Sequence, residues 1–198
     1  MNPFSERNVQ VQRAMTIVLC TFFASSALAQ APNRSATPVA HHESAAYQKW
    51  LDEDVRWIIA GDEKKAFQQL STDEERDHFV DQFWSRRNPT PGAENKFKEE
   101  HYRRLAYANE HFAARRPGWR TDRGHIYILY GPPSRIENRL FVDNNGKKYP
   151  QVRWHYDALL GFSGAVDMDF VDGCACGDYE LQLSEDLRNQ FLNIAKPF

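Results

Sequence analysis

The chain has 198 residues, of which 41% are hydrophobic and 13% aromatic. That is enough to bury one core, but two full domains of ordinary size would be crowded. The formal net charge is −2, and no stretch gathers lysine and arginine as a nucleic-acid-binding surface does. We therefore expect no nucleic-acid partner.

Residues 1–29 have the three parts of a secretory signal peptide. Two arginines precede an apolar run over 14–28, and the small residues Ala27 and Ala29 stand where a signal peptidase needs them. This run is short for crossing ~30 Å of hydrocarbon, and no later stretch is apolar enough to span a membrane. We expect cleavage after Ala29 and a periplasmic or secreted mature protein without a membrane span; an uncleaved anchor is the alternative.

Residues 30–46 are small, polar and proline-bearing, which predicts a disordered linker. The remainder, 47–198, is expected to form a single domain. Its first half has apolar residues at helical spacing over 47–59, and Gly61 is expected to end that helix. A short second helix would bury Ala66, Phe67 and Leu70.

Two further helices follow in the same half of the chain. Ser71 or Thr72, each followed three residues later by a glutamate, predicts a capping box at the start of the third helix. The prolines at 89 and 91 interrupt the pattern. The fourth helix is expected over 94–114, with one apolar stripe formed by Phe97, His101, Leu105, Ala108 and Phe112.

After residue 118 the apolar period becomes two, which indicates strands. Strands are expected over the ranges 125–130, 139–142, 152–156, 166–171 and 179–183. Asn145-Gly146 is a strong tight-turn signal and predicts a hairpin over 139–156. A last short helix is expected over 185–195. The predicted fold is α+β, with a layer of about four helices packed on a small antiparallel sheet.

At the junction between the helical half and the strand half, each residue type has a local structural explanation. Pro117 cannot continue a helix, and Gly118 is expected to take the left-handed conformation that ends one. Trp119 has a wide apolar body to bury. The short oxygen-bearing side chains of Thr121 and Asp122 bond nearby backbone amides in turns.

The run "GWRTDRGHIYILYGPPSRIE", which starts at Gly118, resembles the signature of the GWxTD domain, a bacterial family named after Gly-Trp-any-Thr-Asp. The block "FVDQFWSRRNPTPGAENKFKEEHYRRLAYAN" before it is similar to that family too. This sequence has Asn88 where similar proteins often have Asp, so a role that needs that carboxylate is in doubt here. The resemblance implies an exported envelope protein of uncharacterised function and supplies no substrate, cofactor or catalytic residues.

The signature also holds the first candidate ligand site. Its members carry acid, base, guanidinium or aromatic groups that suit an anionic or glycan ligand: Trp119, Thr121, Asp122, Arg123, His125 and Tyr130. The alternative is a structural role, in which Asp122 and Arg123 form a buried ion pair that holds the helix-to-sheet junction.

The second candidate is the arginine pair Arg86 and Arg87, with Arg103 and Arg104 on the next helix. Planar guanidinium groups clamp carboxylates and phosphates, so these side chains could bind an anion. The alternative is a set of salt bridges to Glu99, Glu100 and Asp122.

The segment "VDMDFVDGCACGDYE" holds the remaining chemistry. Its aspartates do not match the spacing of a helix-loop calcium site, and its alternation indicates a half-exposed strand. Cys174 and Cys176 could form a disulfide outside the cytoplasm, whereas a zinc site would need two more ligands. We therefore expect no metal.

No phosphate loop, dinucleotide fingerprint, Gly-x-Ser-x-Gly elbow or His-Glu-x-x-His motif is present, and we expect no cofactor. Two functions of different class remain. One is a binding or scaffolding module of the cell envelope, whose partner is an envelope protein or glycan. The other is a hydrolase of envelope glycan or peptide material that uses Asp122, Arg123 and His125.

Overall fold

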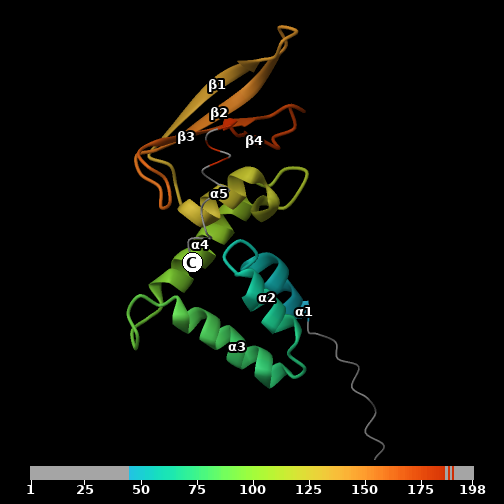
Figure 1. Cartoon of the computed structure of the whole chain (residues 1–198). Helices are drawn as coiled ribbons and strands as arrows, with labels where there is room; N and C mark the ends of the chain where they lie inside the picture. The colour runs from blue at the N-terminus through green and yellow to red at the C-terminus, as the bar shows by residue number, and fades with distance from the viewer. Residues whose placement is uncertain (1–44, 186, 188, 190–198) are drawn as a thin grey trace, which may run out of the picture. The chain divides into compact units, whose positions relative to one another are not determined.

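The computed structural model describes residues 45–185, 187 and 189, and the fold of this part is α+β (Figure 1). Five α-helices in residues 45–130 precede a four-stranded antiparallel sheet. The predicted signal peptide and most of the predicted linker lie outside the described residues, as does most of the helix predicted over 185–195.

The helix predicted over 47–59 is divided in the structure. Helix α1 (Ala45–Lys49) continues into a π-helical turn, η1 (Trp50–Asp54). The prediction that Gly61 ends this helix is wrong, because Gly61 is the first residue of α2 (Gly61–Gln68). The backbone N–H of Ala60 donates to the carboxylate of Glu63 at 3.0 Å, which satisfies an amide at the start of α2.

Helix α3 (Asp73–Arg86) begins with the predicted capping box. The hydroxyl of Thr72 accepts from the N–H of Glu75 at 3.2 Å, and the Glu75 carboxylate accepts from the N–H of Thr72 at 3.0 Å. Thr72, and not Ser71, is therefore the cap. Phe83 and Trp84 lie buried on the inner side of this helix.

Helix α4 (Lys96–His111) has the predicted stripe. His101, Leu105 and Ala108 are buried along one side, and Phe112 is buried directly after the last turn. Asn95 caps the helix by accepting from the N–H of Lys98 at 3.0 Å. The periodicity therefore found the helix and its inner side.

The strand predicted over 125–130 is wrong, because these residues belong to helix α5 (Asp122–Tyr130). The hydroxyl of Thr121 caps this helix by accepting from the N–H of Gly124 at 3.0 Å. A 3-10 turn, η2 (Gly118–Arg120), precedes the cap. A short apolar run such as this one has no periodicity that distinguishes a strand from a buried helix.

The sheet has strands β1 (Arg135–Val142), β2 (Lys148–Tyr156), β3 (Val166–Val171) and β4 (Glu180–Gln182), in that spatial order. All neighbours pair antiparallel. The predicted hairpin is confirmed as β1 and β2, whose turn contains Gly146 in the left-handed region (φ 79°).

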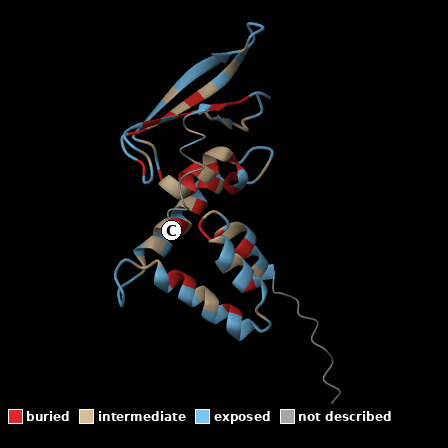
Figure 2. Cartoon of the chain, viewed as in Figure 1, coloured by how far each residue is buried: buried red, intermediate tan, exposed pale blue. Residues whose placement is uncertain are grey.

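The two faces of the sheet differ in chemistry. The even-numbered residues of β3 and those of β2 from Val152 on, such as Trp154, are buried on the helical side of the sheet. The opposite face has ion pairs such as Arg153–Asp169 at 2.5 Å. This is the pattern of an antiparallel sheet with one packed and one solvated face. Figure 2 shows the buried positions along these strands.

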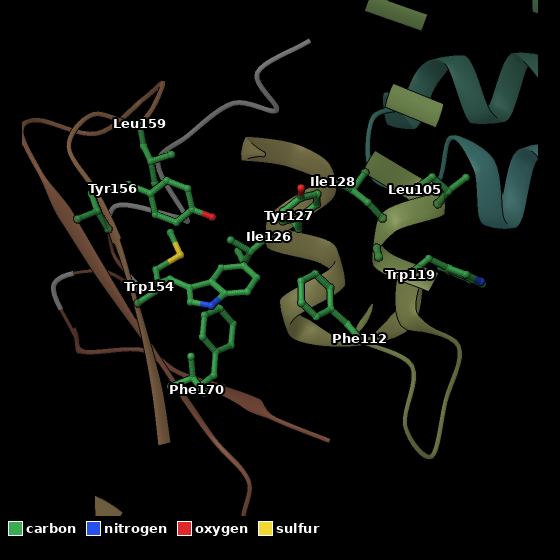
Figure 3. Packing of buried hydrophobic residues seen from close by; sticks show 14 residues of the cluster. Leu105, Phe112, Trp119, Ile126, Tyr127, Ile128, Trp154, Tyr156, Leu159 and Phe170 are labelled. Carbon is green, nitrogen blue, oxygen red and sulfur yellow. The ribbon is translucent and has the colours of Figure 1, made fainter. Parts of the chain in front are cut away.

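Buried apolar residues form two clusters. The sheet cluster joins β2 and β3 to α4, α5 and Trp119 (Figure 3). The helical cluster lies among α1, η1, α2 and α3, and contains Trp50, Phe67 and Phe83. The prediction of one layer of about four helices on the sheet is therefore right only in part: α4 and α5 supply the helical side of the sheet cluster, while α1 to α3 gather around the other one.

Candidate functional site

Two of the three glycines of the signature, Gly118 and Gly124, are sites of close backbone approach. A Cβ on Gly118 would lie 1.9 Å from the carbonyl oxygen of Ala108, and one on Gly124 would lie 1.9 Å from the carbonyl oxygen of Gly118. Neither glycine has a positive φ, so the predicted left-handed conformation of Gly118 is wrong. These positions need glycine because α4, η2 and α5 touch there through their backbones.

Trp119 and Thr121 fix the turn between these helices. The backbone N–H of Trp119 donates to Asn109 Oδ1 at 3.0 Å, and its carbonyl accepts from the indole of Trp57 at 2.9 Å. The hydroxyl of Thr121, which is fully buried, donates to the carbonyl of Gly118 at 2.8 Å. The backbone of Trp119 and the side chain of Thr121 therefore hold the junction.

Asp122 joins the start of α5 to the last strand. Its Oδ2 accepts from the backbone N–H of Leu181 at 2.8 Å, and its Oδ1 lies 3.4 Å from Arg116 Nη2. Arg116 also contacts Asp178 at 3.2 Å. The ion pair proposed between Asp122 and Arg123 is not formed, because Arg116 is the cation beside this carboxylate.

Arg123 extends in another direction. Its Nη2 donates to the carbonyl of Gly177 at 3.1 Å, and its guanidinium lies over the rings of Tyr179 (4.2 Å) and Phe112 (5.1 Å). Burial lowers the pKa of Arg123. Among the described residues its buried Nε–H has no hydrogen-bond acceptor. A ligand that offers an acceptor could satisfy this donor.

His125 does not join Asp122 and Arg123 in one site. Its ring stacks on Trp57, with the centroids 3.7 Å apart. Tyr130, at the end of α5, lines a different cavity of about 320 Å³ with Glu100, His101 and Arg104. The signature residues are thus distributed over several contacts.

The arginines proposed as an anion clamp bind carboxylates of the chain. Arg86 and Arg87 both contact Glu63, at 2.9 and 2.7 Å. Arg103 and Arg104 both contact Glu100, at 2.7 and 2.6 Å. Of the three predicted partners, Glu100 is confirmed, whereas Glu99 pairs with Lys96 and Asp122 with Arg116. Glu63 was not foreseen, because nothing in the sequence spacing relates it to residues 86 and 87.

These contacts shift the pKa of both carboxylates. Burial alone would raise the pKa of Glu63, but the hydrogen bonds from Arg87, the Ala60 amide and Arg86 outweigh it and lower the pKa to about 2. The hydrogen bond from Arg103 is the main cause that lowers the pKa of Glu100 to about 2. Both carboxylates are therefore ionised at neutral pH, and each offsets the charge of one of its two arginines.

Cys174 and Cys176 form a disulfide in the exposed turn between β3 and β4. The buried carboxylate of Asp172 accepts from the backbone N–H of Cys176 at 3.1 Å and of Gly177 at 2.8 Å. Asp172 is also the third member of the one potential metal-binding group found within the described part of the chain. The sulfur atoms of Cys174 and Cys176 are bonded to each other, so the oxidised pair offers no thiolate ligands.

Sequence reasoning missed the outer edge of β1. Four of the six large hydrophobic residues that are exposed in the described structure lie on this strand: Ile136 (56%), Leu140 (63%), Phe141 (40%) and Val142 (52%). Of these four, Ile136 lines a cavity of about 240 Å³, whose walls come from α4, α5, β1 and β2 and include Tyr107, Tyr127, Trp154 and Arg123. The available signal was the pattern "RIENRLFV", in which large apolar residues continue to the hairpin tip, beyond the part of the sheet that packs on helices.

This geometry can be compared with known proteins. The family model of the GWxTD domain matches residues 31–194. The chain belongs to the GWxTD domain family. Comparison with curated proteins and with solved structures gave no match.

Burial distinguishes the specified positions of the Gly-Trp-any-Thr-Asp motif from its variable position. Gly118, Trp119 and Thr121 are buried, and Asp122 is half-buried with a backbone partner, but Arg120 at the variable position is exposed. No contact of the junction requires a particular side chain there. The motif therefore describes a structural corner of the domain.

None of the helices described here is long and apolar enough to cross a membrane.

Proposed function

We propose that this GWxTD domain is a binding module of the bacterial cell envelope, and that it binds an extended segment of a partner protein along β1. The observation that carries the proposal is that an edge strand has large exposed apolar side chains. Edge strands in native proteins are ordinarily protected by charges, prolines or bulges, because their free N–H and C=O groups can pair with another chain. The charges of β1, on Arg135, Glu137 and Arg139, pair with one another on the face opposite to Ile136 and Leu140.

The backbone of β1 is available for such pairing. Asp143 donates its N–H to the carbonyl of Lys147 at 2.9 Å, across the end of the hairpin. Because bonding direction alternates along an antiparallel strand, the even-numbered residues of β1, including Asn138 and Leu140, direct their N–H and C=O groups away from β2. β1 is also the first strand in the order of the described sheet.

Side chains around the edge define the partner's chemistry. Ile136 lies opposite Trp154 and Leu140 lies opposite Pro150, so these apolar residues point to the helical side of the sheet. An added strand would place alternate side chains on the same side, next to the aromatic cavity. Arg123 lines that cavity, and its positive charge favours a segment with a carbonyl or carboxylate there.

Export to the envelope is part of this proposal. It is supported by the signal-peptide pattern of residues 1–29 and by the family match, which begins at residue 31. The alternative, a hydrolase based on Asp122, Arg123 and His125, has less support because the three side chains engage separate partners.

A photo-crosslinking residue in place of Leu140, expressed in the exporting cell, tests the proposal. We expect a crosslink to an extended segment of one envelope protein. Asn138→Pro, which removes an outward N–H from β1, should reduce this crosslink at least tenfold. Asn138→Ala keeps the N–H and should preserve it. A crosslink that persists in a folded Asn138→Pro protein, or that joins only two copies of this chain, would contradict the proposal.

A further inference from the structure

The turn over 172–177 has a second property, which does not depend on β1 or on its proposed partner. Its disulfide joins Cys174 to Cys176 across the single residue Ala175, and all three residues are exposed. Ala175 has a φ of 53° and is the one non-glycine residue with a positive φ in the described structure. The disulfide thus closes a loop with a single intervening residue, and this loop is exposed to solvent.

A disulfide in so short a loop contributes little to folding. In the chain-entropy account a crosslink stabilises by restricting the unfolded state, and the effect grows with the length of the closed loop. A loop with one intervening residue restricts few conformations. Structural stabilisation is therefore a weak reason for these two cysteines.

Other contacts hold the turn in place. The Asp172 carboxylate accepts two backbone N–H groups, those of Cys176 and Gly177, and is itself buried. From α5, Arg123 donates to the carbonyl of Gly177 at 3.1 Å. None of these contacts uses a sulfur atom, so the turn keeps its anchors whether the cysteines are oxidised or reduced.

We propose that Cys174 and Cys176 are a redox-active pair that exchanges with dithiols. A thiolate of the dithiol attacks one sulfur of the Cys174–Cys176 bond and forms a mixed disulfide, while the other cysteine leaves as a thiolate and takes up a proton. The second thiol of the reductant then displaces the first cysteine. In total the pair gains two electrons and two protons, and the dithiol becomes a disulfide.

The exposure of the bond is what makes this exchange feasible. An attacking thiolate must approach along the line of the two sulfur atoms, which a buried structural disulfide prevents. Exposed disulfides are the labile class, whereas structural ones resist reduction by glutathione. The Asp172 carboxylate, 3.3 Å from the sulfur of Cys174, disfavours a thiolate at that position and so distinguishes the two cysteines.

The test uses the exported protein equilibrated in glutathione buffers of increasing reducing power, then quenched with acid, alkylated and analysed by mass spectrometry of the peptide that contains both cysteines. We expect reversible conversion between disulfide and dithiol within the range of these buffers. Cys174→Ser and Cys176→Ser each lack the resolving thiol, so each should retain a glutathione adduct that the parent releases at least tenfold faster.

Three results would overturn the proposal. One is a disulfide that stays oxidised even in excess reduced glutathione, which would make it a structural bond. Another is a pair of free thiols in every buffer. The third is zinc retained by the reduced protein at one ion per chain and lost in an Asp172→Asn variant, which would reassign the turn as a metal site.

Discussion

Asp122 accepts a hydrogen bond at 2.8 Å from the backbone N–H of Leu181, a residue 59 positions further along the chain. This bond fastens the start of α5 to β4. Arg116 lies beside the same carboxylate and also contacts Asp178. The aspartate of the signature thus connects the helical half of the domain to the end of the sheet.

Replacing this carboxylate should destabilise the fold. Asp122→Asn loses the charge near Arg116 and at the first turn of α5, and we expect a loss of about 1 kcal/mol in the free energy of unfolding. Asp122→Ala also loses the bond to Leu181 and should cost about 1–3 kcal/mol. Urea unfolding at pH 7 measures both, with the exposed Glu110→Gln as the control. An Asp122→Asn protein as stable as its parent would point to a ligand site.

Gly118→Ala should be strongly destabilising, because its Cβ would be placed 1.9 Å from a backbone oxygen of α4. Overpacking costs about 1–3 kcal/mol and sometimes more. The matched control is Gly61→Ala, at a position with free space and no positive φ, where we expect a change within about 1 kcal/mol. Equal melting temperatures for the two variants would show that the junction is not packed as described.

Glu63→Gln should lower the free energy of unfolding at pH 7 by about 3 kcal/mol, because the buried guanidinium of Arg87 loses its charged partner. The pKa of Glu63 in the folded protein is about 2, below its ordinary value of 4.5. The stabilisation is therefore complete above the ordinary pKa and is lost as the pH falls from 4.5 towards 2.

The measurement is a series of urea unfolding curves between pH 7 and pH 2.5 for the parent and for Glu63→Gln. The difference in stability between them should shrink over the acidic part of this range. A difference that stays constant with pH would mean that the Glu63 carboxylate is not held ionised by Arg86 and Arg87.

Replacing Cys174 and Cys176 together with serine should leave the melting temperature within a few degrees, on the order of 1 kcal/mol. The reason is the short loop that their bond closes. Thermal melts of parent and double variant, both without reductant, measure the effect. Loss of soluble expression in the double variant would assign the pair a structural role.

The mature chain should begin at Gln30, directly after the small residues of the predicted cleavage site. N-terminal sequencing of protein recovered from the periplasm or the medium measures this. Full-length protein confined to the cytosol would contradict the predicted export.

Elements with a local signal were predictable from the sequence. The capping box of Thr72 and Glu75, the stripe along α4 and the hairpin around Gly146 each depend on residues close together in the chain. β3 agrees with its predicted range, because its alternation matches the one-sided burial of the sheet.

Helix α5 was not predictable in the same way. Ile126, Tyr127 and Ile128 are all buried in the sheet cluster, and Leu129 packs against the helical cluster. Because the second half of α5 is covered on more than one side, residues 126–130 have no polar face and read as a continuous apolar run.

The contacts of the candidate site residues were harder still to predict, because their partners are far away in the sequence. Glu63 meets Arg87 across 24 residues, and Asp122 meets Leu181 across 59. Sequence reasoning identified residues with suitable chemistry, such as Asp122 and Arg123, but it could not foresee which charges neutralise each other. The exposed edge of β1 could be found only when the extent of the helices beside the sheet was known.

The two apolar clusters have a consequence for dividing the domain. Helix α4 contributes Leu105 and Ala108 to the sheet cluster and Phe97 to the helical one, and Tyr102 packs against both. A fragment that ends before α4 would leave the inner surface of α1 to α3 uncovered, and one that begins after it would leave the sheet cluster without Leu105 and Ala108. A shortened version that omits α4 would therefore expose apolar surface at either break, and we expect it to aggregate more readily than the longer chain.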